Sequence, residues 1–565
     1  MPTNVLDEEV IQKLIAPGQM LEIVEETING VPLRVYKNTP ASLRDVFALS
    51  KTHGDNDFLV YEDERWPFDR HYRAVATVAR WLVEECGIRK GDRVAVAMRN
   101  FPEWSVAFWA ATCAGAIVVP LNAWWTSDEL AYGLSDSGTR VLFCDLERWQ
   151  RVEPKMSELP LLSRVVIAKG APPPRTDGFD DLMVSQTDVL PEMELGPDDD
   201  ATIFYTSGTT GFPKGALGTH RNICTNLMNL VYARMSGAAR AGIDPATAPA
   251  PVNRPAQLLS VPFFHVTGCH STLVPNLAFG GKLVLMYRWN PERALELIER
   301  ERITSFGGVP TMVWQVLESP DFPKRDTSSV LSIGYGGAPA PTELVRRIEQ
   351  HFPKAAPGNG YGLTETSSLA VGNGGADYIR KPESCGRPAP VVDAMVVGDK
   401  GDEVPDGELG ELWLRGPNVV RGYWNKPEAT NETFHDGWLK TGDVARIDDE
   451  GFIYIVDRAK DMVIRGGENV YCVEIEDVLY EHPAVSEAAV IGIPHRVLGE
   501  EVAAVVKRVR GANVTEDELK DFVAERLAAF KVPVKIDISD EPLPRNAAGK
   551  VLKRDLKERL ATAPA

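Results

Sequence analysis

Short apolar runs rich in β-branched residues alternate with helical stretches along this 565-residue chain. Residues 93–97 (RVAVA), 140–143 (RVLF) and 282–285 (KLVL) are typical of buried strands, whereas residues 291–302 carry an apolar stripe at helical spacing. Such alternation favours layered α/β structure with largely parallel sheets, because helices cover the faces of these sheets. With 44% hydrophobic residues the chain can bury large cores, and we expect more than one domain.

A second, smaller pattern begins near residue 457. Strands predicted at 487–493 and 501–508 precede a helix predicted at 516–530, which is enough for a compact α+β domain. The longest apolar run, residues 106–121, is too short for a membrane span and predicts a buried helix followed by a strand. We therefore predict an α/β fold with a large domain of layered α/β subdomains, a hinge and a small mobile C-terminal α+β domain, at residues 1–456, 457–461 and 462–565.

Charge and cysteine usage narrow the class of protein. A formal net charge of -19 argues against nucleic acid as the main partner, because binding to a phosphate backbone needs a basic face. The seven cysteines are dispersed and form no Cys-x-x-Cys pair, which indicates free thiols in a reducing compartment. The N-terminal residues 4–9 (NVLDEE) are acidic where a signal peptide would be basic, so we expect a cytoplasmic protein without an integral membrane segment. The oligomeric state stays open.

Residues 205–215 (YTSGTTGFPKG) bring hydroxyls, glycines and one lysine into a single turn. Backbone N–H groups and side-chain O–H groups can converge there on one anion, and Lys214 adds a positive charge. The spacing differs from that of the Walker loop, since the lysine follows a proline instead of opening a helix. The segment predicts a loop that holds a polyphosphate, and the alternative is a solvated Ser/Thr/Gly hairpin.

Five further motifs follow in order: residues 334–339 (GYGGAP), 359–365 (NGYGLTE), 440–443 (KTGD), 457–461 (DRAKD) and 544–550 (PRNAAGK). Together with the first loop they resemble the signature series of the adenylate-forming superfamily, which holds acyl-CoA synthetases, peptide synthetase adenylation domains and firefly luciferase. The resemblance covers roughly residues 40–560 and is strongest to fatty-acid-CoA ligases. Lys440, Asp457 and Ala547 depart from the residues most frequent in the family, but none of them replaces a reacting group.

The resemblance implies a two-step reaction with ATP and CoA as substrates and Mg2+ as cofactor. A carboxylic acid is first converted into an acyl-AMP anhydride with release of pyrophosphate, because a carboxylate is itself a poor electrophile. The acyl group then passes to the thiol of CoA and AMP leaves. We therefore expect an AMP-forming acyl-CoA synthetase.

The matching positions imply roles for individual residues. Phosphate contacts are expected from Thr206, Ser207, Gly208, Thr209, Thr210, Gly211, Lys214 and Thr364. Adenosine contacts are expected from Gly336, Gly337, Ala338, Pro339, Asn359, Gly360, Tyr361, Gly362, Asp443 and Arg458. In chemical terms, Tyr361 offers a ring for stacking on adenine, and Asp443 offers two acceptor oxygens for ribose hydroxyls. The alternative is that Tyr361 is a buried ring in a glycine-rich turn.

Glu365 is placed to hold Mg2+, a hard cation that prefers oxygen ligands, with Thr206 and Thr364 as neutral companions. Lys550 is the main catalytic candidate, since the family's matching lysine reaches the carboxylate and the α-phosphate. Lys460 matches the hinge position of the family. Rotation about it would exchange Lys550 for a tunnel wall that binds CoA and contains Gly466, Gly467 and Glu468.

The acid is harder to assign from these residues. His265 matches an aromatic position near the carboxylate, although a lone histidine in an apolar run is often a core residue. Apolar walls are expected from Phe264, Val309, Tyr335 and Leu363, and no basic cluster near them suggests a second carboxylate. A medium- to long-chain fatty acid is therefore the leading substrate. The alternative acid is an aryl or steroid side-chain acid. A carrier protein is the alternative acceptor to CoA, and a noncatalytic nucleotide sensor is the alternative to an enzyme.

Overall fold

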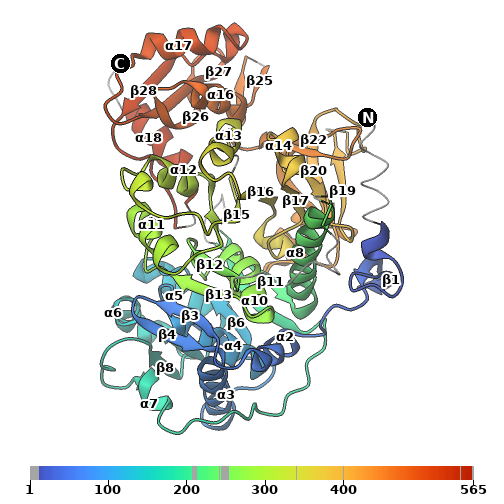
Figure 1. The fold of residues 1–565 in the computed structure, drawn as a ribbon, viewed down its shortest axis with the longest axis vertical. Helices are drawn as coiled ribbons and strands as arrows, with labels where there is room; N and C mark the ends of the chain where they lie inside the picture. The colour runs from blue at the N-terminus through green and yellow to red at the C-terminus, as the bar shows by residue number, and fades with distance from the viewer. Residues whose placement is uncertain are drawn as a thin grey trace.

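The computed structural model describes residues 12–206, 213–240, 242–243, 254–338, 340–398, 400–466, 468–547 and 549–562. A large body carries a small domain above it, formed by the C-terminal part of the chain (Figure 1). Trp314 of the body and Tyr480 of the small domain meet edge to face, with ring centroids 6.3 Å apart. The predicted architecture, a mixed α/β protein with a large N-terminal and a small C-terminal domain, is confirmed.

Two large sheets form the centre of the body. The seven-stranded sheet runs β11 (Lys214–Thr219), β10 (Asp200–Thr206), β6 (Ile117–Pro120), β5 (Arg93–Ala97), β7 (Val141–Cys144), β8 (Arg164–Ile167) and β9 (Asp177–Gly178). The nine-stranded sheet runs β18 (Arg387–Pro388), β17 (Val371–Gly374), β16 (Ala356–Tyr361), β15 (Ser332–Gly336), β14 (Ser305–Gly308), β12 (Ala256–Leu259), β13 (Lys282–Leu285), β3 (Asp57–Tyr61) and β4 (Glu64–Pro67). Their central strands are parallel, as predicted.

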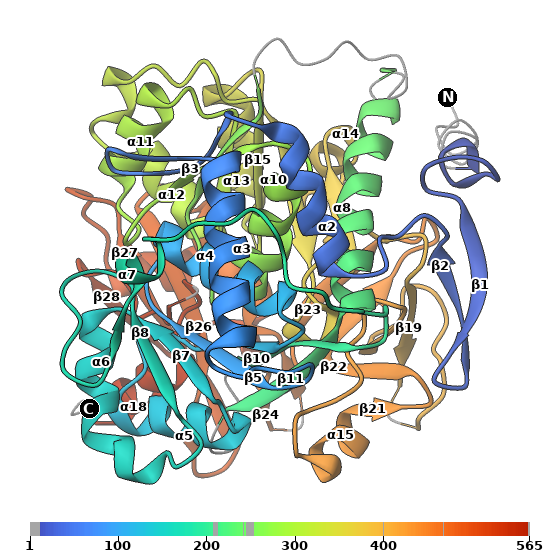
Figure 2. The same cartoon turned by 90° about the horizontal axis from the view of Figure 1, so that it is seen from below.

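Helices separate and cover these sheets, and the layers can be followed in Figure 2. Between the sheets lie α2 (Leu43–Leu49), α3 (Phe68–Glu84), α4 (Pro102–Cys113) and α10 (Val274–Ala278). The outer face of the seven-stranded sheet carries α5 (Ser127–Ser137) and α6 (Leu146–Val152). The outer face of the nine-stranded sheet carries α11 (Pro291–Arg300), α12 (Pro310–Glu318) and α13 (Thr342–His351).

The alternation of side chains along a strand explains how one strand serves two cores. On β5, Val94 and Val96 face the layer between the sheets, whereas Ala95 and Ala97 face α5 and α6. Every residue of α4 is buried because sheets cover it on both sides, so this helix has no polar face. The expectation of a buried helix followed by a strand is therefore confirmed.

A third, antiparallel sheet borders the nine-stranded sheet. It consists of β19 (Asp393–Val397), β20 (Gly410–Arg415), β22 (Trp438–Ile447), β21 (Phe434–His435) and β23 (Ile453–Arg458). Its apolar side packs with α8 (His220–Arg240) and with the N-terminal hairpin of β1 (Ile23–Ile28) and β2 (Val31–Tyr36). The shorter helices of the body are α7 (Phe179–Leu182), α9 (Val266–Gly268), α14 (Ala376–Arg380) and α15 (Pro427–Thr433).

The small domain is built on a separate sheet. That sheet contains β25 (Glu468–Val470), β24 (Val463–Arg465), β27 (Gly499–Arg508), β26 (Val485–His495) and β28 (Lys535–Ser539). One face packs on α16 (Cys472–Glu481) and α17 (Glu516–Ala524), and the other packs on α18 (Lys553–Thr562). The chain changes sheets between Arg458 and Val463, a stretch that overlaps the predicted hinge at residues 457–461.

Several predicted bounds are corrected. The strand predicted at 140–143 is Val141–Cys144, and the helix predicted at 291–302 ends at Arg300. The helix predicted at 516–530 ends at Ala524, and a separate turn, Ala529–Lys531, follows it shortly before Pro533. Val532, which precedes Pro533, is extended, as proline disfavours helical backbone at the residue before it, so the turn ends there. Among the described residues, no helix has the length and apolarity needed to cross a membrane.

Candidate active site

One cavity of about 2610 Å3 brings most of the predicted site residues together. Its walls come from the ends of β14, β15 and β16, from β22 and β23, and from the small domain around residues 545–557. Parallel strands end at a common edge of a sheet, where α/β proteins commonly bind ligands. The cavity is therefore shared between the body and the small domain.

The predicted phosphate loop connects two antiparallel strands. Thr206 ends β10 and pairs with Lys214, the first residue of β11, and both line the cavity. The Thr206 hydroxyl donates to the Lys214 carbonyl at 3.3 Å. The predicted contacts Ser207, Gly208, Thr209, Thr210 and Gly211 lie outside the described residues. Strand pairing thus fixes both ends of the loop at the cavity wall.

Tyr423 joins Lys214 to Glu365. The Tyr423 hydroxyl donates to Glu365 Oε1 at 2.6 Å, and the Lys214 ammonium lies 5.1 Å from the centre of the same ring. Trp424 N–H also donates to the carbonyl of Gly215, which follows Lys214 on β11. Because the hydroxyl is largely buried and faces a carboxylate, the pKa of Tyr423 is raised above its usual value. Tyr423 is therefore a neutral donor that orients Glu365.

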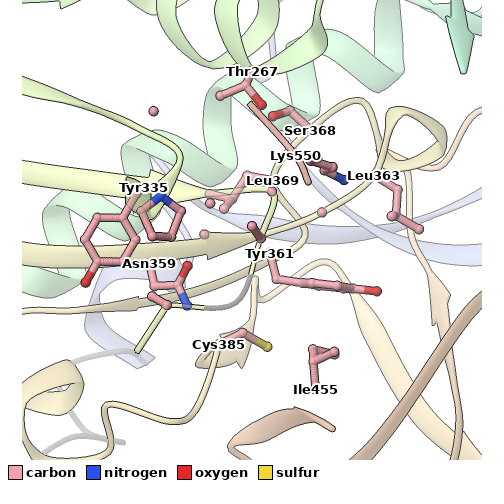
Figure 3. Close-up of a pocket in the computed structure, with 18 of the residues that line it drawn as sticks. Thr267, Tyr335, Asn359, Tyr361, Leu363, Ser368, Leu369, Cys385, Ile455 and Lys550 are labelled. Carbon is pink, nitrogen blue, oxygen red and sulfur yellow. The ribbon is translucent and has the colours of Figure 1, made fainter. Parts of the chain in front are cut away.

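Tyr361, Asp443 and Arg458 form the second polar group. Tyr361 ends β16, and its hydroxyl donates to Asp443 Oδ2 at 2.6 Å. Arg458 Nε lies 3.1 Å from Asp443 Oδ1, and these two residues face each other across the β22–β23 pair. Burial, together with the Asp443 charge, raises the pKa of Tyr361 well above its usual value. Figure 3 shows the Tyr361 ring with Lys550 on one side in this view and with Cys385 and Ile455 on the other.

Glycines allow the chain to approach closely around this ring. A Cβ at Gly336 would lie 2.2 Å from the Gly360 carbonyl oxygen, and one at Gly362 would lie 1.5 Å from the Ser368 carbonyl oxygen. Any side chain at these two positions would displace neighbouring backbone. Ala338 and Asn359 also line the cavity, whereas Pro339 lies outside the described residues.

Lys550 reaches the same cavity from the small domain. It ends a tight turn in which Asn546 N–H donates to the Lys550 carbonyl at 2.9 Å and Gly549 has φ +86°. The Lys550 Cε lies 3.7 Å from the position of a Cβ at Gly337. Burial, followed by the neighbouring Arg458 charge, lowers the pKa of Lys550 to about 8. The Lys550 ammonium thus lies close enough to Arg458, Asp443 and Glu365 for their charges to interact.

His265 is close enough to Lys550 for their charges to interact. It caps the short helix α9, with Nδ1 accepting from Thr267 N–H at 3.3 Å. Burial, together with the Lys550 charge, lowers the pKa of His265 to about 4, so the ring is neutral near pH 7. The lone histidine therefore lies at the cavity and not in a closed core.

The predicted acyl walls are only partly brought together. Phe264, Tyr335 and Leu363 line the cavity, and Figure 3 shows Leu363 near Lys550 and Tyr335 on the far side of the view. Val309 is not among the described residues that line the cavity. It is buried at the start of α12, where a Cβ at Gly549 would lie 2.7 Å from its Cγ2. In the present orientation Val309 packs against the Lys550 turn, and its role as an acyl wall stays a prediction.

The predicted hinge and CoA residues occupy different places. Lys460 lines the cavity in the turn between the two sheets. Gly466 and Glu468 lie at the β24–β25 turn and are absent from the cavity wall formed by the described residues, while Gly467 lies outside that part of the chain. The small domain thus presents Lys550 to the cavity and holds this second turn away from it.

Comparisons with known proteins identify the family. A model described as AMP-binding enzyme matches residues 47–424, and the model of the AMP-binding enzyme C-terminal domain matches residues 474–550. This chain belongs to the AMP-binding enzyme family. A feruloyl-CoA synthase of Amycolatopsis sp is 37% identical, over 86% of this chain and 92% of that protein. A long-chain-fatty-acid–CoA ligase of Bacillus subtilis (strain 168) is 35% identical, over 84% of this chain and 86% of that protein.

A solved structure extends the likeness to the whole fold. The anthranilate CoA ligase AuaEII in complex with anthranoyl-AMP superposes with a TM-score of 0.83 and 26% identity, over 93% of this chain and 99% of that one. As an AMP-binding enzyme with such relatives, the chain is an acyl-CoA synthetase-type adenylating enzyme, an acid–thiol ligase. The adenylate-forming family to which it belongs uses ATP and CoA as substrates.

One residue of this AMP-binding enzyme is not predictable from its local sequence. Tyr423 lies in a segment, residues 421–424 (RGYW), whose only signal is an aromatic pair after a glycine. Its importance comes from the isolated bridge that pairs it with Ala216 on β11, far away in the sequence. A long-range pairing of this kind leaves no local pattern.

Proposed function

We propose that the protein is an ATP-dependent acyl-CoA synthetase that activates a hydrophobic carboxylic acid, of which medium- to long-chain fatty acids are the leading class. The acid forms acyl-AMP with release of pyrophosphate, and the acyl group then passes to CoA with release of AMP. The observation that carries the proposal is the approach of Lys550 to the Tyr361–Asp443–Arg458 group in one cavity. A noncatalytic sensor would have no use for a buried ammonium at this point.

In the first step, the formation of acyl-AMP, charged residues of the cavity each bind a different part of the substrates. Asp443 offers its oxygens to the ribose hydroxyls while Tyr361 and Arg458 hold its carboxylate in place. Lys214 and the loop before it hold the pyrophosphate, and Lys550 neutralises the charge that develops between the acid and the α-phosphate. His265, which is neutral, lies beside the carboxylate of the substrate acid and adds no charge there. Together these groups bring two anions into contact.

Mg2+ fits the oxygen donors on the phosphate side. The Glu365 carboxylate and the hydroxyls of Thr206 and Thr364 line the same cavity, and hard oxygen ligands of this kind are those that Mg2+ prefers. Bound there, the ion would neutralise phosphate charge and help to orient the polyphosphate. Tyr423 holds the Glu365 carboxylate by one oxygen and so fixes its orientation.

For the second step, we propose that the small domain, residues 462–565, rotates about residues 457–461. The change of sheet between Arg458 and Val463 supports this hinge, and Lys460 lies within it. Rotation would withdraw Lys550 and bring Gly466, Gly467 and Glu468 to the cavity as a wall for CoA. In the present orientation only Lys550 of these four faces the cavity among the described residues.

The class of acid rests on the cavity wall and on the relatives. Phe264 and Leu363 favour an apolar chain, and the Bacillus subtilis relative is named for long-chain fatty acids. The feruloyl-CoA synthase and the anthranilate CoA ligase favour an aryl acid as the second candidate. We propose a cytoplasmic location, which the seven free cysteines support.

The test is a panel of acids offered with ATP and CoA, including octanoate, palmitate, ferulate, anthranilate, acetate and malonate. We expect pyrophosphate release and a thioester mass with the fatty acids, and the highest kcat/KM above eight carbons. Preference for ferulate or anthranilate would replace the fatty acid with the aryl class. Pyrophosphate release with no thioester from any acid would point to a carrier protein as the acceptor.

A further inference from the structure

Asp457 is a buried carboxylate at the seam between the two domains. It lies on β23, immediately before Arg458, and is only 3% exposed. Its Oδ2 accepts from the Cys472 N–H at 2.5 Å, and its Oδ1 accepts from the Arg458 N–H at 2.8 Å. Cys472 is the first residue of α16, whose first N–H groups have no partner within the helix. Asp457 thus caps a helix of the small domain from a strand of the body.

This hydrogen bond joins the first residue of the predicted hinge to the small domain. Asp457 precedes the point where the chain changes sheets, and Cys472 follows it. A rotation of the small domain about the residues between them moves the helix terminus relative to the carboxylate. The bond exists in the present orientation, and we expect it to break in an orientation that removes Lys550 from the cavity.

Lys553 and Glu476 connect the same helix to the Lys550 turn. The Lys553 ammonium lies 2.7 Å from Glu476 Oε1, and Val490 N–H donates to that oxygen at 2.8 Å. Glu476 is on α16, one turn from Cys472, and Lys553 begins α18 three residues after Lys550. The charge of Lys553 also acts on Asp457, where it counteracts the rise in pKa that burial causes. Burial of a carboxylate is costly without such compensation.

We propose that Asp457 is a positioning residue that holds the small domain in the orientation that carries Lys550 into the cavity. Lys553 ties α16 to the Lys550 turn through Glu476, and its charge opposes the burial that raises the pKa of Asp457 to about 6. Arg458, the neighbour of Asp457 on β23, contacts Asp443. The same strand therefore carries one residue that contacts Asp443 and one that contacts the small domain. This role rests on the function proposed above for Lys550.

The experiment compares the two half-reactions in Asp457→Asn and Asp457→Ala. Because a hydrogen bond to a charged group is lost, we expect ATP–pyrophosphate exchange to fall by about tenfold to a hundredfold in the alanine variant. Conversion of synthetic acyl-AMP and CoA into acyl-CoA should stay within about twofold or become faster, since the competing orientation is relieved. The matched control is Asp449→Asn, an exposed carboxylate in the turn just before β23, which should change neither half-reaction.

A second pair of variants tests the connection through Lys553. Lys553→Met should slow the exchange reaction in the same direction as Asp457→Ala but less, whereas Arg559→Met, a 52% exposed residue on the same helix that does not line the cavity, should have no effect. Tryptic cleavage at the hinge should be faster in the Asp457 and Lys553 variants. Their thermal unfolding temperature should be unchanged. Cleavage would report orientation independently of activity.

Equal loss of both half-reactions in Asp457→Ala, or an unchanged exchange rate, would overturn the proposal. Lys550→Ala measured in parallel separates this outcome from failure of the proposed function. If Lys550→Ala abolishes exchange while Asp457→Ala leaves it intact, only the positioning role of Asp457 is wrong. If Lys550→Ala keeps full exchange, the proposed role of Lys550 is wrong and the positioning role, which depends on it, is wrong as well.

Discussion

The nucleotide side and the acyl side of the cavity are built in different ways. On the nucleotide side, polar side chains from separate motifs hold one another by short bonds, such as Tyr361 to Asp443 and Tyr423 to Glu365. On the acyl side, Phe264 and Leu363 contribute apolar surface without such bonds, and one predicted wall, Val309, lies elsewhere. Binding of phosphate, ribose and metal ions requires particular residue types, whereas binding of an apolar chain requires only an apolar pocket of suitable shape. The nucleotide side should therefore react sharply to single substitutions, and the acyl side gradually.

The largest effect is expected for Lys550→Ala. Loss of a preorganised positive charge typically costs roughly 3 to 4 kcal/mol in the transition state, a factor of several hundred. ATP–pyrophosphate exchange should fall accordingly, while acyl-CoA formation from synthetic acyl-AMP stays largely intact. Lys520→Ala, on α17 and away from the cavity wall, is the control. If both half-reactions decline in parallel, the division of work between the two turns of the small domain is wrong.

The pH profile of adenylation should reveal the same lysine. Because burial and Arg458 lower the pKa of Lys550 to about 8, the ammonium is present below that pH and is lost above it. We expect kcat/KM for ATP in the exchange reaction to fall about tenfold per pH unit well above pH 8, since this parameter reports the free enzyme. Burial holds the hydroxyl pKa values of Tyr361 and Tyr423 above this range, and His265 titrates near pH 4.

Lys550→Arg provides the comparison for that profile, because arginine stays charged throughout the range. Any residual exchange activity in this variant should lack the alkaline decline. A decline that persists unchanged would assign it to another group, of which Lys460 is the nearest candidate because burial also lowers its pKa.

A moderate effect is expected for Tyr423→Phe. The ring that lies near Lys214 stays, but Glu365 loses the donor that orients it. We expect a severalfold weaker affinity for Mg2+ in the presence of ATP, measured by calorimetry, and a similar rise in the Mg2+ concentration needed for half-maximal exchange. The KM for the acid should not change. Tyr287→Phe, a tyrosine that donates to Glu147 Oε2 at 3.2 Å and does not line the cavity, serves as the control.

The smallest single steps are expected on the acyl side. Each methylene buried in an apolar wall contributes roughly 0.8 kcal/mol, so kcat/KM should rise about fourfold per carbon up to a limit. Phe264→Ala should move that limit or flatten the series without changing ATP–pyrophosphate exchange at saturating acid. Acetate or malonate outperforming octanoate would contradict the fatty-acid assignment and leave the nucleotide side unaffected.

Much of the nucleotide side could be predicted because its chemistry leaves local motifs. The sequence placed Asp443 and Arg458 in one site, but not their direct pairing across β22 and β23, since strand register depends on the whole sheet. Tyr423 and Asp457 act through partners distant in the sequence or across the hinge, which no short motif records. The position of Val309 follows from the packing of the Lys550 turn, a property of the assembled domains. The buried helix α4 and the strand β5 were predictable because their apolar patterns are local.

The single crossing of the chain between Arg458 and Val463 has a kinetic consequence. A group tethered by a short linker experiences an effective concentration of the order of millimolar at its target. The small domain therefore needs no tight interface to return Lys550 to the cavity, and a few weak bonds suffice to bias its orientation. Under the proposed rotation, contacts that are weak enough to break in every catalytic cycle would let one cavity serve two reactions without a slow step of domain release.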